Sequence, residues 1–264
     1  VEESMLDTPP LAIDLARAEM SRMARLLGRM LNAIIIPFMS DEDQVSKQAG
    51  KGEEAELLIR EIPKRDEVHS DLTLIEGLHL RETKIDYLQE KISAYLTSIA
   101  QGNITEEQAE EVFGMVSIVK DMESMGDIIH RNMIPLIAKK KMLRFDFSTE
   151  GKEELLIYHS KVSKQINLLR LAFKETDPKI AYRIMKKERK YLDLESKYRA
   201  RHLKRIILKK ESSIETTEIH MELMDLMKQI VLYSANIAQT YIGTTPDEGV
   251  DHVEVTEDKK ESGE

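Results

Sequence analysis

The sequence predicts an all-α protein in which six long helices form two three-helix bundles. Three observations support this prediction. Only 5% of the 264 residues are aromatic, so the chain is poor in residues that β-strands favour. Long segments repeat apolar residues at steps of three and four, the period of a helix with one buried face. Capping residues and prolines separate these segments.

The first bundle is expected between residues 11 and 141. Pro37 should end its first helix, because proline cannot continue a helix. Thr105 with Gln108 forms a capping box at the start of its third helix, which is expected to bend at Pro135. The expected helices cover residues 11–38, 68–100 and 105–141, with a weaker helical segment at 53–62.

The second bundle is expected between residues 148 and 243. Asp177 before Pro178 marks one helix start, and Ser212 with Glu215 predicts a capping box at another. Glu82 lies 41 residues before Glu123, and Glu188 lies 40 residues before Lys228 in the equivalent helix pair, which indicates a diverged internal repeat. The expected helices cover residues 148–175, 178–210 and 212–243.

The net charge of −9 is concentrated at the C-terminus. Residues 244–264 hold eight acids and two lysines, so they contribute −6 and leave about −3 for the remainder. This segment has few apolar residues and is predicted to be a disordered acidic tail. The absence of cysteine excludes disulfides and thiolate metal sites. No apolar run reaches the ~18 residues that a membrane-spanning helix needs.

Two acidic pairs in the first half are the main candidates for a functional site. Glu82 and Asp86, and likewise Glu123 and Asp127, are four residues apart and share a helix face. Glu82 and Glu123 occupy seam positions where an apolar residue is expected, so each carboxylate is costly without a partner. Two helices that each present two carboxylates would make an oxygen-rich pocket for a hard cation.

The same acids allow a simpler interpretation, in which they form interhelical salt bridges with basic residues and bind no metal. The basic residues nearest in sequence are Lys84, Lys120 and Arg131. His130 follows Glu123 by two turns on the same face, so it is either an additional ligand or a hydrogen-bonded core residue. Gly126 would allow a ligand or a neighbouring backbone to approach closely.

Other motifs carry less information about function. Glu76 and His79 have the E-x-x-H spacing of di-iron carboxylate proteins, which need it twice. Because a second copy is absent, a ferritin-like di-iron protein is only an alternative. The chain has no nucleophile–base arrangement, glycine-rich phosphate loop or H-E-x-x-H motif, so no enzymatic activity is predicted.

Basic residues concentrate in one predicted helix. Residues 183–210 hold twelve Lys and Arg against three acids. This pattern fits either a solvated helix face or contact with an anionic membrane surface. No nucleic-acid recognition motif accompanies it, so nucleic acid is not an expected partner.

The segment from Met122 to Asn132 resembles the PhoU family, whose repeats are three-helix bundles with E-x-x-x-D motifs. Its Glu, Gly and Asp match the family stretch, and Ser234–Ala238 matches the end of that stretch in the second half. The resemblance implies a PhoU-like domain over residues 11–243, with repeats at 11–141 and 148–243. It also implies a divalent or trivalent metal, with iron as the candidate. The implied ligands are Glu82, Asp86, Glu123 and Asp127.

The resemblance is stronger to the C-terminal PhoU-like domain of bacterial type II Na⁺/phosphate cotransporters. It is carried by Leu6–Ala12, Arg17–Ala24 and His79–Leu88. It implies that residues 1–10 link to a preceding membrane domain and that this transporter domain of the same polypeptide is the partner. The domain would then modulate phosphate transport at the cytoplasmic face of the cell membrane. A free-standing PhoU-like phosphate-signalling adaptor is the alternative, and a homodimer is left open.

The second repeat departs from the acidic pattern. Leu192, Lys228 and Leu232 stand where the family carries acids. The sequence therefore predicts one metal site, in the first repeat, and a second repeat with a structural role.

Overall fold

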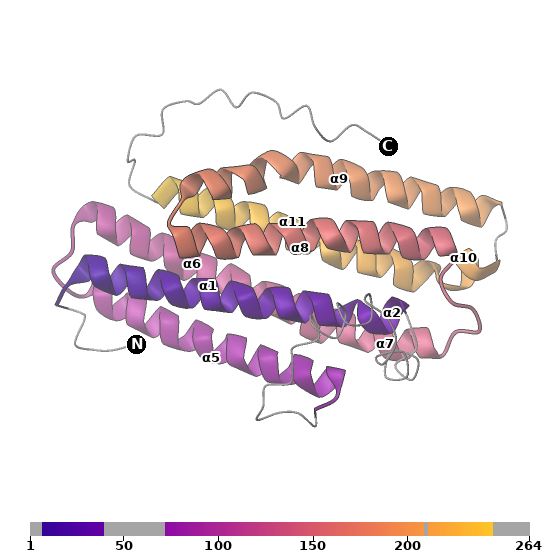
Figure 1. The fold of residues 1–264 in the computed structure, drawn as a ribbon, viewed down its shortest axis with the longest axis horizontal. Coiled ribbons are helices and arrows are strands. Elements are labelled where there is room, and N and C mark those ends of the chain that lie inside the picture. The colour runs from indigo at the N-terminus through magenta and orange to yellow at the C-terminus, as the bar shows by residue number, and fades with distance from the viewer. Residues whose placement is uncertain (1–6, 40–71, 209–210, 245–264) are drawn as a thin grey trace.

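The computed structural model describes residues 7–39, 72–208 and 211–244, and within these ranges the protein is helical without a strand. The all-α prediction is confirmed. Long helices run side by side along the molecule (Figure 1). The elements are α1 (Pro9–Ile34), α2 (Ile36–Met39), α5 (Leu74–Ala100), α6 (Glu106–Asp127), the π-helix η2 (Ile128–Met133), α7 (Ile134–Lys141), α8 (Thr149–Glu175), α9 (Pro178–Ile207), α10 (Glu211–Glu215) and α11 (Thr217–Thr244).

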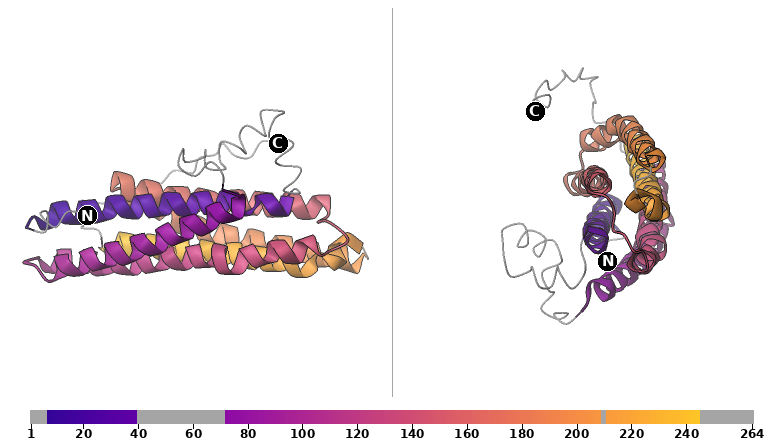
Figure 2. Two further views of the ribbon diagram at one scale, coloured as in Figure 1. Left: turned by 90° about the horizontal axis from the view of Figure 1, so that it is seen from below. Right: turned by 90° about the vertical axis from the view of Figure 1, so that its right-hand side faces the viewer.

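The long helices form two three-helix bundles that share one core. Helices α1, α5 and α6 pack together in the first bundle, and α8, α9 and α11 pack together in the second. The bundles join where α1 packs on α8 and α6 packs on α11. Helices α5 and α9 consequently lie at opposite edges of the molecule (Figure 2). The buried apolar side chains of both bundles form one continuous cluster.

The predicted apolar seam of α5 is confirmed. Leu78, Ile85, Ile92, Leu96 and Ile99 are all buried. Burying a side chain of this size stabilises the fold by about 1.5–3 kcal/mol relative to leaving it exposed. The core therefore fixes which face of α5 turns inward, and with it the positions of the acids on this helix.

Local capping explains where several helices begin. The predicted capping box of α6 is present: Thr105 Oγ1 accepts from the Gln108 N–H at 3.2 Å, and the Thr105 N–H donates to Gln108 Oε1 at 3.1 Å. Asp177 accepts from the Lys179 N–H at 2.8 Å and caps α9. Each of these bonds satisfies a backbone N–H group that the first helical turn leaves unpaired.

Two predicted helices are interrupted by proline. The predicted helix over residues 11–38 breaks at Ile35, so that Pro37 lies in the first turn of the short α2. There its missing N–H costs nothing. The bend predicted at Pro135 is instead a π-helix just before it, in which the Ile134 N–H bonds to the Ile129 carbonyl. The wider π-turn absorbs the interruption without ending the helix.

Two predicted helix starts are wrong. The Ser212–Glu215 segment does not cap the last long helix, because it lies in the separate α10 and α11 begins at Thr217. Helix α5 begins at Leu74, where Thr73 and Glu76 form a capping box that the sequence analysis missed. The predicted segment 53–62, residues 1–6 of the predicted linker and the tail beyond residue 244 lie outside the described residues. Pro9 and Pro10, which were predicted to belong to the linker, form the start of α1.

None of the helices in the described ranges has both the length and the apolar character needed to cross a membrane.

Candidate functional site

The two acidic pairs lie on α5 and α6, which pack against each other in the first bundle. Glu82 is buried, with 8% of its surface exposed, whereas Asp86 is exposed one turn further along α5. Glu123 and Asp127 are half-buried on α6. The structure therefore gives the four carboxylates different environments. Holding a charged carboxylate costs most at Glu82, because this side chain is the most buried of the four.

The carboxylates destabilise one another's charge. Burial raises the pKa of Glu82 above its ordinary value, and the charges of Asp86 and Asp127 raise it further, against the opposing effect of His130. Burial also raises the pKa of Asp127, with an added contribution from Glu123. A raised carboxyl pKa means that the charged form is destabilised. The acids thus form one electrostatically coupled group across the two helices.

Basic residues neutralise two of these acids from the same helix. Lys120 Nζ donates to Glu123 Oε2 at 2.6 Å, and Arg131 Nε lies 3.0 Å from Asp127 Oδ1. These two acids therefore have basic partners, as the salt-bridge interpretation requires. However, both pairs are three or four residues apart within one helical segment, so they do not tie α5 to α6. Exposed pairs of this kind contribute at most about 1 kcal/mol.

The polar link between the two segments passes through a histidine. The π-helix η2 carries His130, whose Nδ1 lies 3.4 Å from Glu82 Oε1. Its Nε2 lies 2.6 Å from Nδ1 of His79 on α5. Glu82, His130 and His79 therefore form a chain across the helix boundary. The π-turn helps to make this chain possible because it rotates the residues that follow it relative to a regular α-helix.

Two further expectations for this region can be compared with the geometry. Glu76 completes the α5 cap by accepting from the Thr73 N–H at 2.7 Å and is exposed, so the E-x-x-H pair does not face a bundle interior as a di-iron site requires. Gly126 faces the side chains of Ile85 and Leu27 at ordinary contact distances, so its role is packing and not the approach of a ligand.

The acids do not enclose a metal position as their side chains are placed. In the part of the chain that the structure describes, no three His, Asp or Glu side chains converge to hold an ion. Two atoms of the region are nevertheless buried without a hydrogen bond of good geometry, Asp127 Oδ1 and His130 Nδ1. The donor types suit a hard cation, but binding would require the side chains to rotate toward one another.

The second repeat handles its acids differently. Glu195 on α9 is buried and accepts from Arg199 at 2.6 Å. Arg199 also donates to Asp225 on α11 at 2.9 Å, and Lys228 donates to the same carboxylate at 2.7 Å. Lys228, which stands where the family carries an acid, therefore completes a neutral network between two helices.

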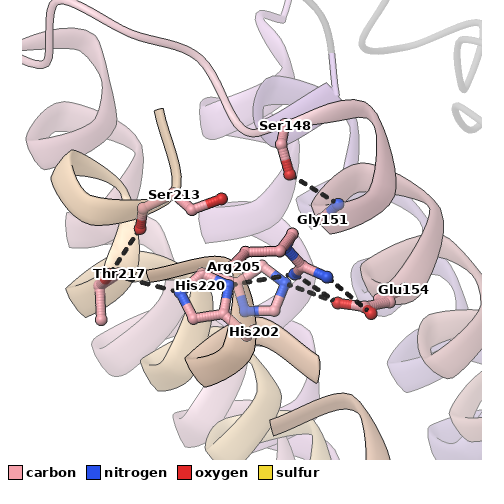
Figure 3. Close-up of polar contacts among 8 residues, drawn as sticks. All are labelled: Ser148, Gly151, Glu154, His202, Arg205, Ser213, Thr217 and His220. Atoms are coloured by element: carbon pink, nitrogen blue, oxygen red, sulfur yellow. Dashed lines mark hydrogen bonds and ion pairs between the residues drawn. The ribbon is translucent and has the colours of Figure 1, made fainter. Parts of the chain in front are cut away.

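A second polar cluster, which the sequence analysis missed, lies between α8, α9 and α11 (Figure 3). Arg205 donates two hydrogen bonds to Glu154, at 2.9 and 2.6 Å, and both side chains are buried. The rings of His202 and His220 stack beside this pair with centroids 4.2 Å apart. His202 Nε2 lies 3.3 Å from Thr217 Oγ1.

Both histidines of this cluster are held in their neutral form. Burial, with the charge of Arg205, lowers the pKa of His202 to about 4. Burial, with His202 and Arg205, lowers the pKa of His220 to about 3, and neither nitrogen of its ring makes a well-formed hydrogen bond. The signal in the sequence was the three-residue spacing of His202 and Arg205 on the buried stripe of α9, which was hidden among the surrounding lysines and arginines.

These two histidines predict that the protein loses stability in mild acid. In the unfolded chain both rings protonate near pH 6.5, whereas in the folded protein they stay neutral to about pH 4 or below. The unfolded state therefore binds more protons in this window. Each ring should lower the free energy of unfolding by up to about 1.4 kcal/mol per pH unit as pH falls from 6.5 toward 4.

Urea unfolding at several pH values checks this expectation. His220→Gln should flatten the pH dependence between pH 6.5 and 4, while His79→Gln, which alters an exposed ring on α5, should not. An unchanged slope in His220→Gln would mean that this ring titrates alike in both states.

Comparison with known proteins agrees with this architecture. Residues 68–132 match the PhoU domain family. Over 242 residues the chain is 22% identical to the candidate inorganic phosphate export protein YjbB of Salmonella typhimurium. The aligned region covers 92% of this chain and 39% of YjbB. The Escherichia coli K12 protein of the same name is 23% identical over 164 residues, 62% of this chain and 30% of the relative. The chain thus spans about two fifths or less of these relatives.

Solved structures share the fold at low sequence identity. PhoU from Pseudomonas aeruginosa superimposes with a TM-score of 0.65 at 14% identity, covering 89% of this chain and 97% of that one. The phosphate transport system regulatory protein PhoU from Streptococcus pneumoniae gives a TM-score of 0.66 at 14% identity, covering 92% of this chain and all of that one. Residues 68–132 are therefore similar in sequence to the PhoU domain family, and the described helices share the fold of these two PhoU structures.

Proposed function

We propose that this chain is the regulatory PhoU-like domain of a phosphate-transporting membrane protein and that it modulates phosphate movement without enzymatic activity. The observation that carries the proposal is the relationship to YjbB: 92% of this chain aligns with only 39% of a protein named for phosphate export. A helical regulatory domain attached to a larger transport protein accounts for this difference in length. The proposed partner is the transporter domain of the same polypeptide, at the cytoplasmic face of the membrane.

As part of the same proposal, the membrane protein is a Na⁺/phosphate cotransporter, to whose C-terminal domain the sequence is similar. Sodium dependence and the direction of phosphate movement would be properties of the transporter domain. The contribution of this chain would be a surface whose shape depends on how α5 packs on α6, because α5 lies at the outer edge of the first bundle (Figure 2). A regulatory domain acts by favouring one state of its partner through differential contacts.

One observation favours the alternative of a free-standing adaptor. The whole of the Streptococcus pneumoniae PhoU chain is covered by the superposition, and that protein is named as a regulatory protein of a phosphate transport system. In this version the same helical surface would bind a separate transporter subunit. The two versions share the regulatory role and differ only in whether the partner is covalently attached.

A metal ion would suit the acidic group of the first bundle. Glu82, Asp86, Glu123 and Asp127 would supply the oxygen ligands, with His130 as an additional donor. The support is electrostatic: the pKa values of Glu82 and Asp127 are raised, and a cation would relieve the repulsion that contributes to this. The ion would supply charge neutralisation and would hold α5 against α6. Divalent manganese and iron in either common oxidation state fit these donors.

The metal proposal predicts that the protein contains bound metal and that added metal stabilises the fold. Both effects should depend on Glu123 and Asp127 of α6. Protein purified without chelator should contain metal by elemental analysis, and saturating Mn²⁺ should raise its melting temperature by several degrees. The double variant Glu123→Gln, Asp127→Asn should lose both the metal and the stability gain, because two of the four carboxylate ligands are gone.

A matched control alters acids elsewhere on the same helix. Glu107→Gln with Glu110→Gln removes the same charge from exposed positions of α6 and should retain the metal. Equal metal content in both double variants would contradict a site at Glu123 and Asp127.

The regulatory proposal predicts an effect on phosphate flux in cells. The full gene product should be expressed in cells deprived of other phosphate transporters, and movement of ³²P-phosphate should be followed in both directions. Glu82→Ala with Asp127→Ala should change the flux at least about threefold at equal protein levels, since a regulatory coupling of 1 kcal/mol corresponds to about fivefold. An unchanged flux in this variant would contradict regulation through the first bundle.

A further inference from the structure

Helix α9 presents a long exposed face at the edge of the second bundle. It packs against α8 and α11 and lies along the top of the molecule in Figure 1. Its buried side chains form the stripe that includes Ile180, Ile184, Tyr191 and Tyr198. With 30 residues it is about 45 Å long, so its outer face is a ridge running along much of the molecule.

Eight basic side chains are exposed on this ridge, which we call the α9 outer face. They are Lys179, Arg183, Lys186, Arg189, Lys190, Lys197, Arg201 and Lys204. Asp193 is the one fully exposed acid of α9. The concentration of positive charge is notable in a chain whose net charge is −9. A solvated face alone does not require this separation of charge.

The basic residues of α9 fall into two groups, one facing the bundle and one facing outward. Arg199 and Arg205 turn toward the bundle and pair with Glu195 and Glu154. None of the eight residues of the outer face forms an ion pair with a described residue. The inward cations therefore have a structural role, while the outer ones remain available for a partner.

Large apolar side chains accompany the exposed cations. Near the C-terminal end of the ridge, Leu203 is 47%, Ile207 78% and Leu208 65% exposed. Near the other end, Tyr182 is 56% exposed. Exposed apolar groups next to lysine and arginine are the combination found on protein surfaces that insert shallowly at the boundary between headgroups and acyl chains.

We propose that the α9 outer face lies on an anionic lipid surface, with Tyr182, Leu203, Ile207 and Leu208 entering the headgroup region. A membrane fits better than a small anion, because the charges extend along the whole helix instead of converging on one point. It also fits the mixture of charge and exposed apolar area. The proposal depends neither on the metal site nor on covalent attachment to a transporter.

Vesicle sedimentation with the full chain tests this proposal. The protein should pellet with vesicles of phosphatidylcholine containing about one third phosphatidylserine, and not with phosphatidylcholine alone. Binding should weaken as salt rises, because screening shortens the range of the attraction to about 8 Å at physiological ionic strength. Reversing three charges, Lys186→Glu, Arg189→Glu and Lys190→Glu, should weaken binding roughly 100-fold, since each basic residue near the surface contributes about fivefold.

The control reverses three exposed charges in the first bundle, Arg22→Glu, Arg25→Glu and Lys91→Glu. It therefore has the same net charge as the α9 triple variant. It should bind within about threefold of the unaltered chain, and circular dichroism should show both variants folded. Failure of the full chain to bind anionic vesicles at low salt would overturn the proposal, and would point to an acidic protein or to the acidic residues 247–264 as occupants of this face. Equal loss in both triple variants would also overturn it, since the attraction would then follow net charge alone.

Discussion

The continuous apolar core that joins the two bundles is the constraint on which the rest of the structure depends. Because α1 packs on α8 and α6 packs on α11, the two central helices of each bundle are covered on several sides, and any polar group there must be neutralised. The second bundle meets this requirement internally: Arg205 pairs with Glu154, and Arg199 pairs with Glu195. The first bundle also does so for Glu111, which pairs with Arg17 across α1 and α6.

Glu82 does not follow this rule. Its seam position is buried, its pKa is raised, and its nearest basic group is the ring of His130 at 3.4 Å. The repeats therefore differ in more than sequence: one completes its charge network with lysine and arginine, and the other leaves it incomplete. An incomplete network costs stability, and such costs are often retained where they serve binding. This asymmetry is the physical basis for placing a cation site in the first bundle.

Most of the fold could be predicted because its determinants are local. Helix starts at Thr105 and Asp177 follow from single capping side chains, and the α5 seam follows from periodicity alone. The stacking of His202 on His220 could not be predicted in this way, because it joins two different helices. Pro37 and Pro135 predicted interruptions, but not that these would be a break at Ile35 and a π-helix. For the site, the sequence identified the acids but not the chain through His130 to His79, which a π-turn helps to create.

The most direct test of this account is a titration of individual carboxyl groups followed by carbon-13 NMR in metal-free protein. The account predicts that the pKa of Glu82 lies above the ordinary value of glutamate and that of Asp127 above the ordinary value of aspartate, and that a diamagnetic divalent cation such as Mg²⁺ or Zn²⁺ lowers both. Ordinary pKa values at both positions, unchanged by the cation, would contradict the claim that the first bundle contains an incomplete charge network.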